Sequence, residues 1–282
     1  MMKNNLKFLA CAFVCLGLGA QVAAASPILA SGAVNEANFN VVQNIQDTDH
    51  SGTLSVGDLV YGILNVTRIS SGGSTLWNAN NVPGPGVDSL SGYYVAAVTS
   101  ITALPSPFAA SITLGPAASD PNGVLSASDL AAHTAVKLFA DTLTPFQTGT
   151  SVAADIASAT DGLLWASLGL NGGYWSSVLM NNGLIFAGGG LNFTSNHTGE
   201  NFTPQSNPSC SPGCSPTDFV FSTIATDNGP GQVWRYSGGN NGTLETVPEP
   251  ATPLLLLAGL LGWAASRRGG RKPELQNPKF TR

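Results

Sequence analysis

Residues 47–58 form an acidic stretch, DTDHSGTLSVGD, in which oxygen atoms recur at alternate positions. Positions one, three, five and twelve carry side-chain oxygens, and position seven can add its backbone carbonyl. Such spacing directs several oxygens toward one centre, and a hard cation such as calcium binds oxygen ligands of this kind. We therefore predict a Ca²⁺ site, and its expected ligands are Asp47, Asp49, Ser51, Thr53 and Asp58.

The same stretch resembles the calcium loop of EF-hand and dockerin proteins, with Gly52 at the position of the sharp turn. Asp58 is shorter than the glutamate usual at position twelve, so the resemblance implies weak binding, with a Kd of about 10⁻⁴–10⁻³ M. The following residues, 59–69, are rich in β-branched types and predict a strand instead of the exiting helix of an EF-hand. The alternative is an Asp-rich turn that forms without any metal.

A second stretch, residues 118–129, repeats part of this spacing. It has Ala118 at the first position and Pro121 at the fourth, which removes a carboxylate and restricts the backbone. We predict a turn there.

Patterns typical of catalysis are absent from the sequence. It contains no Gly-x-Ser-x-Gly, no His-Glu-x-x-His and no phosphate-binding loop. His50, His133 and His197 are its only histidines, and none has a local context that suggests a nucleophile. We predict no catalytic residue and a non-enzymatic protein. A secreted hydrolase whose carboxylate pair is assembled by the fold is an alternative.

Aromatic residues suggest a further alternative, a carbohydrate-binding module of an exopolysaccharide matrix. Sugar rings stack on exposed aromatic faces, whereas alternating aromatics can equally fill a core. The residues concerned are Trp77, Tyr93, Tyr94, Tyr174, Trp175 and Trp234.

The region between residues 26 and 246 predicts one all-β domain, sandwich-like, with few short helices. Short runs of β-branched and aromatic residues alternate with turn-forming Gly, Pro and Asn. The stretch 187–217 reads as a long surface loop, and a short helix is expected at 128–135. The expected strands are 59–69, 93–101, 108–114, 134–139, 183–186, 219–225 and 233–236.

The first 25 residues predict a secretory signal peptide. Lys3 and Lys7 precede an apolar stretch, and small residues lead to a cleavage site after Ala25. Signal peptidase is therefore an expected partner.

The other end of the chain combines three features. Val247, Pro248, Glu249 and Pro250 precede an apolar run at 251–265, which predicts one transmembrane helix with some bilayer thinning. The basic cluster that follows predicts a cytoplasmic C-terminus. It consists of Arg267, Arg268, Arg271 and Lys272, and residues 273–282 form the expected cytoplasmic tail.

These three features together, at 247–272, resemble the PEP-CTERM sorting signal of exopolysaccharide-producing Gram-negative bacteria. The resemblance implies that a membrane-embedded exosortase cleaves near the PEP motif. It also implies a single-pass intermediate in the inner membrane, followed by transfer to the cell surface or release.

Charge and cysteine content fit an exported domain. Residues 26–246 contain only three basic residues, Arg68, Lys137 and Arg235, against 14 acidic ones, and such a surface repels nucleic acid. Cys210 and Cys214 flank a Pro-Gly turn, which in an oxidising compartment predicts a disulfide between them.

Overall fold

The structure, a computed structural model, is almost wholly β. It describes residues 27–79, 88–141, 146–149, 151–206 and 214–248. Those up to Val247 belong to one compact unit. Two short helices are present, α2 (Ala127–Ala131) and α3 (Val152–Ala159). The strands are β1 (Val34–Gln46), β2 (Leu59–Ser71), β3 (Ser74–Asn78), β4 (Ser89–Ala103), β5 (Phe108–Gly115), β6 (Thr134–Asp141), β7 (Leu163–Met180), β8 (Leu184–Asn196), β9 (Phe202–Thr203), β10 (Phe219–Asp227) and β11 (Tyr236–Thr246).

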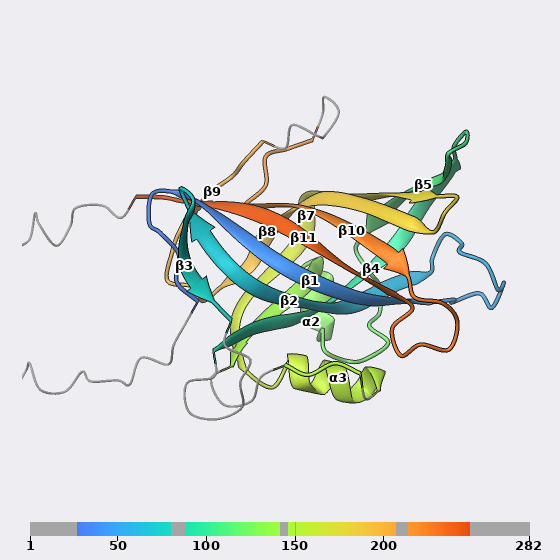
Figure 1. Cartoon of the computed structure of the whole chain (residues 1–282), viewed down its shortest axis with the longest axis horizontal. Coiled ribbons are helices and arrows are strands. Elements are labelled where there is room, and N and C mark those ends of the chain that lie inside the picture. The colour runs from blue at the N-terminus through green and yellow to red at the C-terminus, as the bar shows by residue number, and fades with distance from the viewer. Residues whose placement is uncertain (1–26, 80–87, 142–145, 150, 207–213, 249–282) are drawn as a thin grey trace, which may run out of the picture. The chain divides into compact units, whose positions relative to one another are not determined.

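The antiparallel strands close into one barrel. Strand order runs β2-β1-β11-β10-β8-β7-β5-β4, and β4 pairs again with β2, which completes a ring of eight strands. Figure 1 shows β1, β2, β10 and β11 side by side along one wall of this ring. The all-β prediction is confirmed. The predicted sandwich is wrong, because the β2–β4 pairing joins what would be two separate edges.

Strands β5 and β6 share one place in the ring. The first part of β4, from Ser89 to Tyr94, pairs with β6, and its second part, from Ala97 to Ala103, pairs with β5. Strand β7 divides in the same way between β6 and β5. The wall is therefore continuous at both ends, and it has no open edge at this position.

The barrel interior holds the larger core. Alternate residues of β1, namely Ala37, Phe39 and Val41, point inward, as the two-residue period of a strand requires. Glycines on neighbouring strands make room for aromatic rings: a Cβ at Gly242 would lie 2.3 Å from the ring of Phe219. Burial of one apolar face of each strand supplies the main stabilisation.

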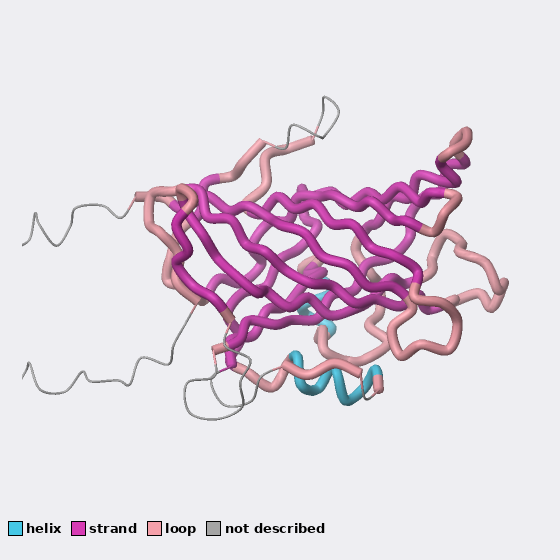
Figure 2. Tube along the Cα trace, in the orientation of Figure 1, coloured by secondary structure: helices cyan, strands magenta, loops and turns pink. Residues whose placement is uncertain are grey.

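A second core lies outside the barrel, over β2 and β4. Helix α3 covers this face with Ile156 and Ala159, and Figure 2 shows the helix outside the ring of strands. The indole N–H of Trp234 donates to Asp155 Oδ2 over 2.7 Å, which ties the loop before β11 to this helix. Asp155 and Trp234 are both buried.

Some element boundaries differ from the predicted ones. Helix α2 begins after Ser126, whose hydroxyl accepts from the backbone N–H of Asp129, and it ends at Ala131, so the predicted helix 128–135 extends too far. The predicted loop 187–217 is also wrong in its first part, because β8 continues to Asn196. Strand β11 starts at Tyr236, where the predicted strand 233–236 ends.

No helix in the described ranges is long and apolar enough to cross a membrane. The predicted signal peptide, the apolar run at 251–265 and the basic cluster lie outside the described residues, so these remain predictions.

Candidate functional site

The predicted calcium stretch is the loop that joins β1 to β2. Gln46 pairs with Leu59, so residues 47–58 fill the whole connection between two neighbouring strands. The predicted strand after the loop is confirmed by β2. The loop is therefore held at both ends by the barrel wall.

Three carboxylates of this loop converge. One oxygen each from Asp47, Asp49 and Asp58 lies within 4.8 Å of the other two. Oxygens bound to one calcium ion at 2.3–2.6 Å are separated by at most about 5 Å, so this grouping fits a common ion. In the described part of the chain, no other three His, Cys, Asp or Glu side chains meet in this way.

The backbone of the loop folds around these carboxylates. Asp47 accepts from the backbone N–H groups of Ser51 (3.1 Å) and Gly52 (2.7 Å). Gly52 has a φ of 75°, in the left-handed region that favours glycine, which confirms the predicted sharp turn. The Ser51 hydroxyl donates to the Thr53 carbonyl over 2.8 Å, so these two predicted ligands lie side by side.

Asp58 connects the two ends of the loop. Its side chain is buried, and its two oxygens accept from the backbone N–H groups of Thr48 (2.9 Å) and Ser55 (2.7 Å). Burial opposes the charge of Asp58, but these hydrogen bonds outweigh it and lower the pKa of the carboxyl. Asp58 thus has a structural role in this loop whether or not a metal is present.

The exposed Asp49 also titrates low. Hydrogen bonds from Ser51, and then from the Ser55 hydroxyl, lower its pKa from 3.8 to about 2. Both carboxylates are therefore ionised at neutral pH, which is the form that binds a cation.

These pKa shifts predict acid sensitivity. A carboxyl with a lowered pKa in the folded state contributes stability above its unfolded pKa and loses it as the pH falls through the folded value. We expect the unfolding midpoint to be nearly constant from pH 7 to pH 5 and to fall between about pH 4 and pH 2. Thermal unfolding across this range tests the expectation, and Asp58→Asn should give a shallower fall. An equally steep fall in that variant would contradict it.

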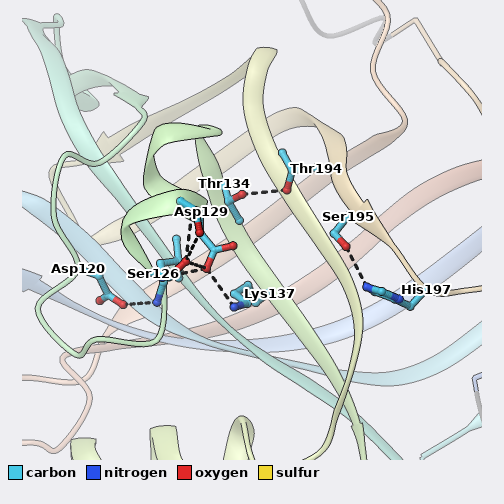
Figure 3. A network of polar contacts seen from close by, with 10 residues as sticks. Asp120, Ser126, Asp129, Thr134, Lys137, Thr194, Ser195 and His197 are labelled. Atoms are coloured by element: carbon cyan, nitrogen blue, oxygen red, sulfur yellow. Dashed lines mark hydrogen bonds and ion pairs between the residues drawn. The ribbon is translucent and has the colours of Figure 1, made fainter.

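The two carboxylates of the second acidic stretch, Asp120 and Asp129, have different hydrogen-bond partners. Asp120 accepts from the Tyr93 hydroxyl (2.6 Å) and from the backbone of Asn122 and Leu125. Asp129 caps α2 and forms an ion pair with Lys137 over 3.1 Å. Figure 3 shows these two carboxylates with separate partners. Residues 118–129 therefore include a closed turn and a helix cap, and the two carboxylates do not share a site.

Most of the aromatics that suggested a carbohydrate site are buried. Trp77, Tyr93, Tyr94, Trp175 and Trp234 are each at most 7 % exposed. Tyr94 packs against Trp175 inside the barrel, with ring centroids 5.6 Å apart. These residues form the two cores, and in this structure they present no stacking face to a sugar.

One polar pair was missed by the sequence reasoning. Ser195 Oγ lies 2.9 Å from His197 Nε2 at the end of β8, as Figure 3 shows. Ser195 lies in β8, and His197 is the first residue after the strand, two positions further along, so the two-residue period of a strand would have suggested one face had β8 been predicted. Ser195 is half-buried and His197 is exposed. Among the described residues no carboxylate is hydrogen-bonded to His197, so the pair lacks the third group that orients a catalytic histidine.

Cys214 is disulfide-bonded. Its predicted partner, Cys210, lies outside the described residues, so the pairing itself remains a prediction.

The predicted sorting segment begins where the barrel ends. Thr246, the last residue of β11, is 1 % exposed, and its hydroxyl donates to the Ala30 carbonyl over 2.5 Å. Val247 is exposed, and its backbone N–H donates to the Asn201 carbonyl over 2.8 Å. No linker separates the last strand from the PEP residues, and Glu249 and Pro250 lie outside the described residues.

Comparison with family models identifies this segment. Residues 246–268 match the PEP-CTERM protein-sorting motif. No curated protein and no solved structure matches the chain. The motif implies export to the cell envelope or surface, with an exosortase as the processing enzyme, and it covers none of the chain before Thr246. The chain therefore carries a PEP-CTERM sorting motif at its C-terminal end.

Proposed function

We propose that this chain is a non-enzymatic protein of the cell surface or extracellular matrix, delivered there as a processed barrel. The observation that carries the proposal is the sorting motif at 246–268. In this scheme signal peptidase removes residues 1–25, and the apolar run at 251–265 holds the protein in the inner membrane until exosortase cleaves near the PEP residues.

The end of the barrel supports this order of events. Strand β11 pairs with β1 along ten residues and with β10 along nine, and all of these pairs end before Thr246. Cleavage beyond Val247 therefore removes no strand of the ring. The protein that leaves the membrane retains a complete barrel.

Two observations support a structural or binding role over catalysis. The aromatics are buried, and the pair Ser195–His197 has no orienting carboxylate.

Cell fractionation tests the proposed location of the protein. We expect the processed protein in the surface and polysaccharide-matrix fractions, and release of part of it when the matrix is digested. Accumulation in the periplasm or cytoplasm would contradict the proposal.

We further propose that calcium stabilises the barrel through the β1–β2 loop. The convergence of Asp47, Asp49 and Asp58 supports this, and Ser51 and the Thr53 carbonyl would complete the ligand set. Asp58 would bind the ion through one oxygen only, because its carboxylate also accepts hydrogen bonds from two backbone N–H groups. Weak binding in the range of extracellular calcium modules follows.

Thermal unfolding of the released protein, with calcium or with chelator, tests the metal. With a Kd of about 10⁻⁴–10⁻³ M, 10 mM calcium adds about 1.5–2.5 kcal/mol and raises the midpoint by about 3–10 °C. We expect Asp47→Ala to remove this rise. Glu36→Gln, which alters an exposed carboxylate on β1 outside the loop, should keep it. Coincident curves for the unmodified protein would show that the loop is a turn without a metal.

A further inference from the structure

The barrel encloses an apolar cavity of about 160 Å³. Every strand of the ring contributes to its lining. Eight-stranded barrels are wide enough either to be filled by side chains or to hold one small ligand. The volume is similar to that of an engineered cavity of about 150 Å³ in another protein, which stays dry and binds benzene. Representative lining residues are Phe39, Leu90, Leu114, Trp165, Trp175 and Phe221.

The cavity is uncharged. None of the described residues that line it is Asp, Glu, Lys, Arg or His. A charged ligand would lose its hydration there without gaining an opposite charge, and this excludes carboxylates, phosphates and amines as occupants. Neutral molecules are the class that this interior accepts.

Two indole groups in the lining have no partner for their N–H. Trp165 and Trp175 are 5 % and 7 % exposed, and no described residue accepts from the Nε1 of either ring. Buried donors are almost always hydrogen-bonded in folded proteins, because an unmade bond costs the desolvation of the group. By contrast, the Tyr94 hydroxyl at the same cavity donates to Gln43 Oε1 over 2.8 Å.

Trp175 has the surroundings of a binding site. Its ring lies between those of Tyr94 and Phe221, with centroids 5.6 Å and 5.2 Å away, and both of these rings also line the cavity. An aromatic ligand could pack against such a wall while its acceptor atom meets the indole N–H. A single water molecule is a poorer occupant, since buried water needs two to four polar partners.

We propose that the barrel cavity binds a small neutral molecule, aromatic or short-chain aliphatic, whose carbonyl or ether oxygen accepts a hydrogen bond from Trp175 Nε1. The apolar lining favours a ligand with an apolar ring or chain, and the indole N–H favours a ligand that also carries one acceptor oxygen. The proposed hydrogen bond involves neither the sorting segment nor the carboxylates of the β1–β2 loop, although Leu54 of that loop lines the cavity.

The test uses three probes with the protein as purified from the producing cells. Acetophenone carries an aromatic ring and one carbonyl, ethylbenzene has nearly the same shape without an acceptor, and benzoate is charged. The indole N–H resonances of ¹⁵N-labelled tryptophan report each site directly, and Trp→Phe variants assign them. We expect acetophenone to shift the Trp175 resonance downfield, ethylbenzene to bind about five- to tenfold more weakly, and benzoate not to bind.

Two variants separate the hydrogen bond from simple apolar binding. Trp175→Phe keeps an aromatic ring and removes the donor, so acetophenone should bind about five- to tenfold more weakly while ethylbenzene is unaffected. Trp234→Phe is the matched control, because that indole already donates to Asp155 outside the barrel. If Trp175→Phe does not fold, the shift of the Trp175 indole N–H resonance on addition of acetophenone to the unmodified protein still tests the proposed hydrogen bond. No shift at Trp175, a shift at Trp165 alone, or equal affinity for acetophenone and ethylbenzene would overturn the proposal.

Discussion

Replacement of Pro248, Glu249 and Pro250 by alanine is expected to stop processing of the chain. These residues lie in the sorting motif directly after the last strand of the barrel. A proline restricts its own φ angle and has no backbone N–H, and the glutamate supplies the one charge of the segment, so the triple variant removes both features by which a protease could recognise it. We expect the amount of released protein to fall at least about tenfold, which corresponds to about 1.4 kcal/mol or more in recognition. The chain that keeps its C-terminal segment should accumulate in the membrane fraction.

The sequence offers a matched control for this experiment. Pro273 and Glu274 form a second Pro-Glu pair, which lies beyond the end of the motif match at residue 268. Alanine at these two positions should leave release unchanged. If the triple variant is released as efficiently as this control, the PEP residues are not the signal that exosortase reads.

Asp58→Ala is expected to be the most destabilising change in the β1–β2 loop. The carboxylate is buried and accepts the backbone N–H groups of Thr48 and Ser55, both of which lose their partner in the variant. A hydrogen bond to a charged group contributes about 1.5–3 kcal/mol, so we expect the loss of both bonds to cost about 3 kcal/mol in total. For a barrel of this size the midpoint should fall by about 6–12 °C.

This experiment is carried out in chelator, so that calcium does not contribute. Asp49→Ala is the control, because Asp49 is exposed and belongs to the same group of carboxylates. Its midpoint in chelator should move much less than that of Asp58→Ala. Equal shifts would mean that the backbone bonds of Asp58 do not hold the loop.

The sequence predicted local features of this barrel better than its closure. The strand after the acidic loop and the turn at Gly52 are both confirmed. Closure depends on the pairing of β2 with β4, and nothing local to either strand indicates it. Sandwiches and barrels both bury one face of each strand, so the same two-residue alternation is typical of both.

The glycine run at 188–190 explains why the first part of the stretch 187–217 was predicted as a loop instead of a strand. Its composition favoured a loop, yet all three glycines belong to β8 and pair with residues of β10. A Cβ at Gly190 would lie 2.2 Å from Thr217 Oγ1, and one at Gly189 would lie 2.7 Å from the ring of Phe221. Glycine is present there because neighbouring side chains approach the backbone closely, a cause that only the folded structure reveals.

The intact mass and C-terminal sequence of the protein recovered from the cell surface test the central claim most directly. The account predicts a chain that begins near Ser26, retains all of β11 through Thr246, and ends close to the PEP residues, without the apolar run and the basic cluster. Recovery of a surface protein that still extends to Arg282 would contradict it.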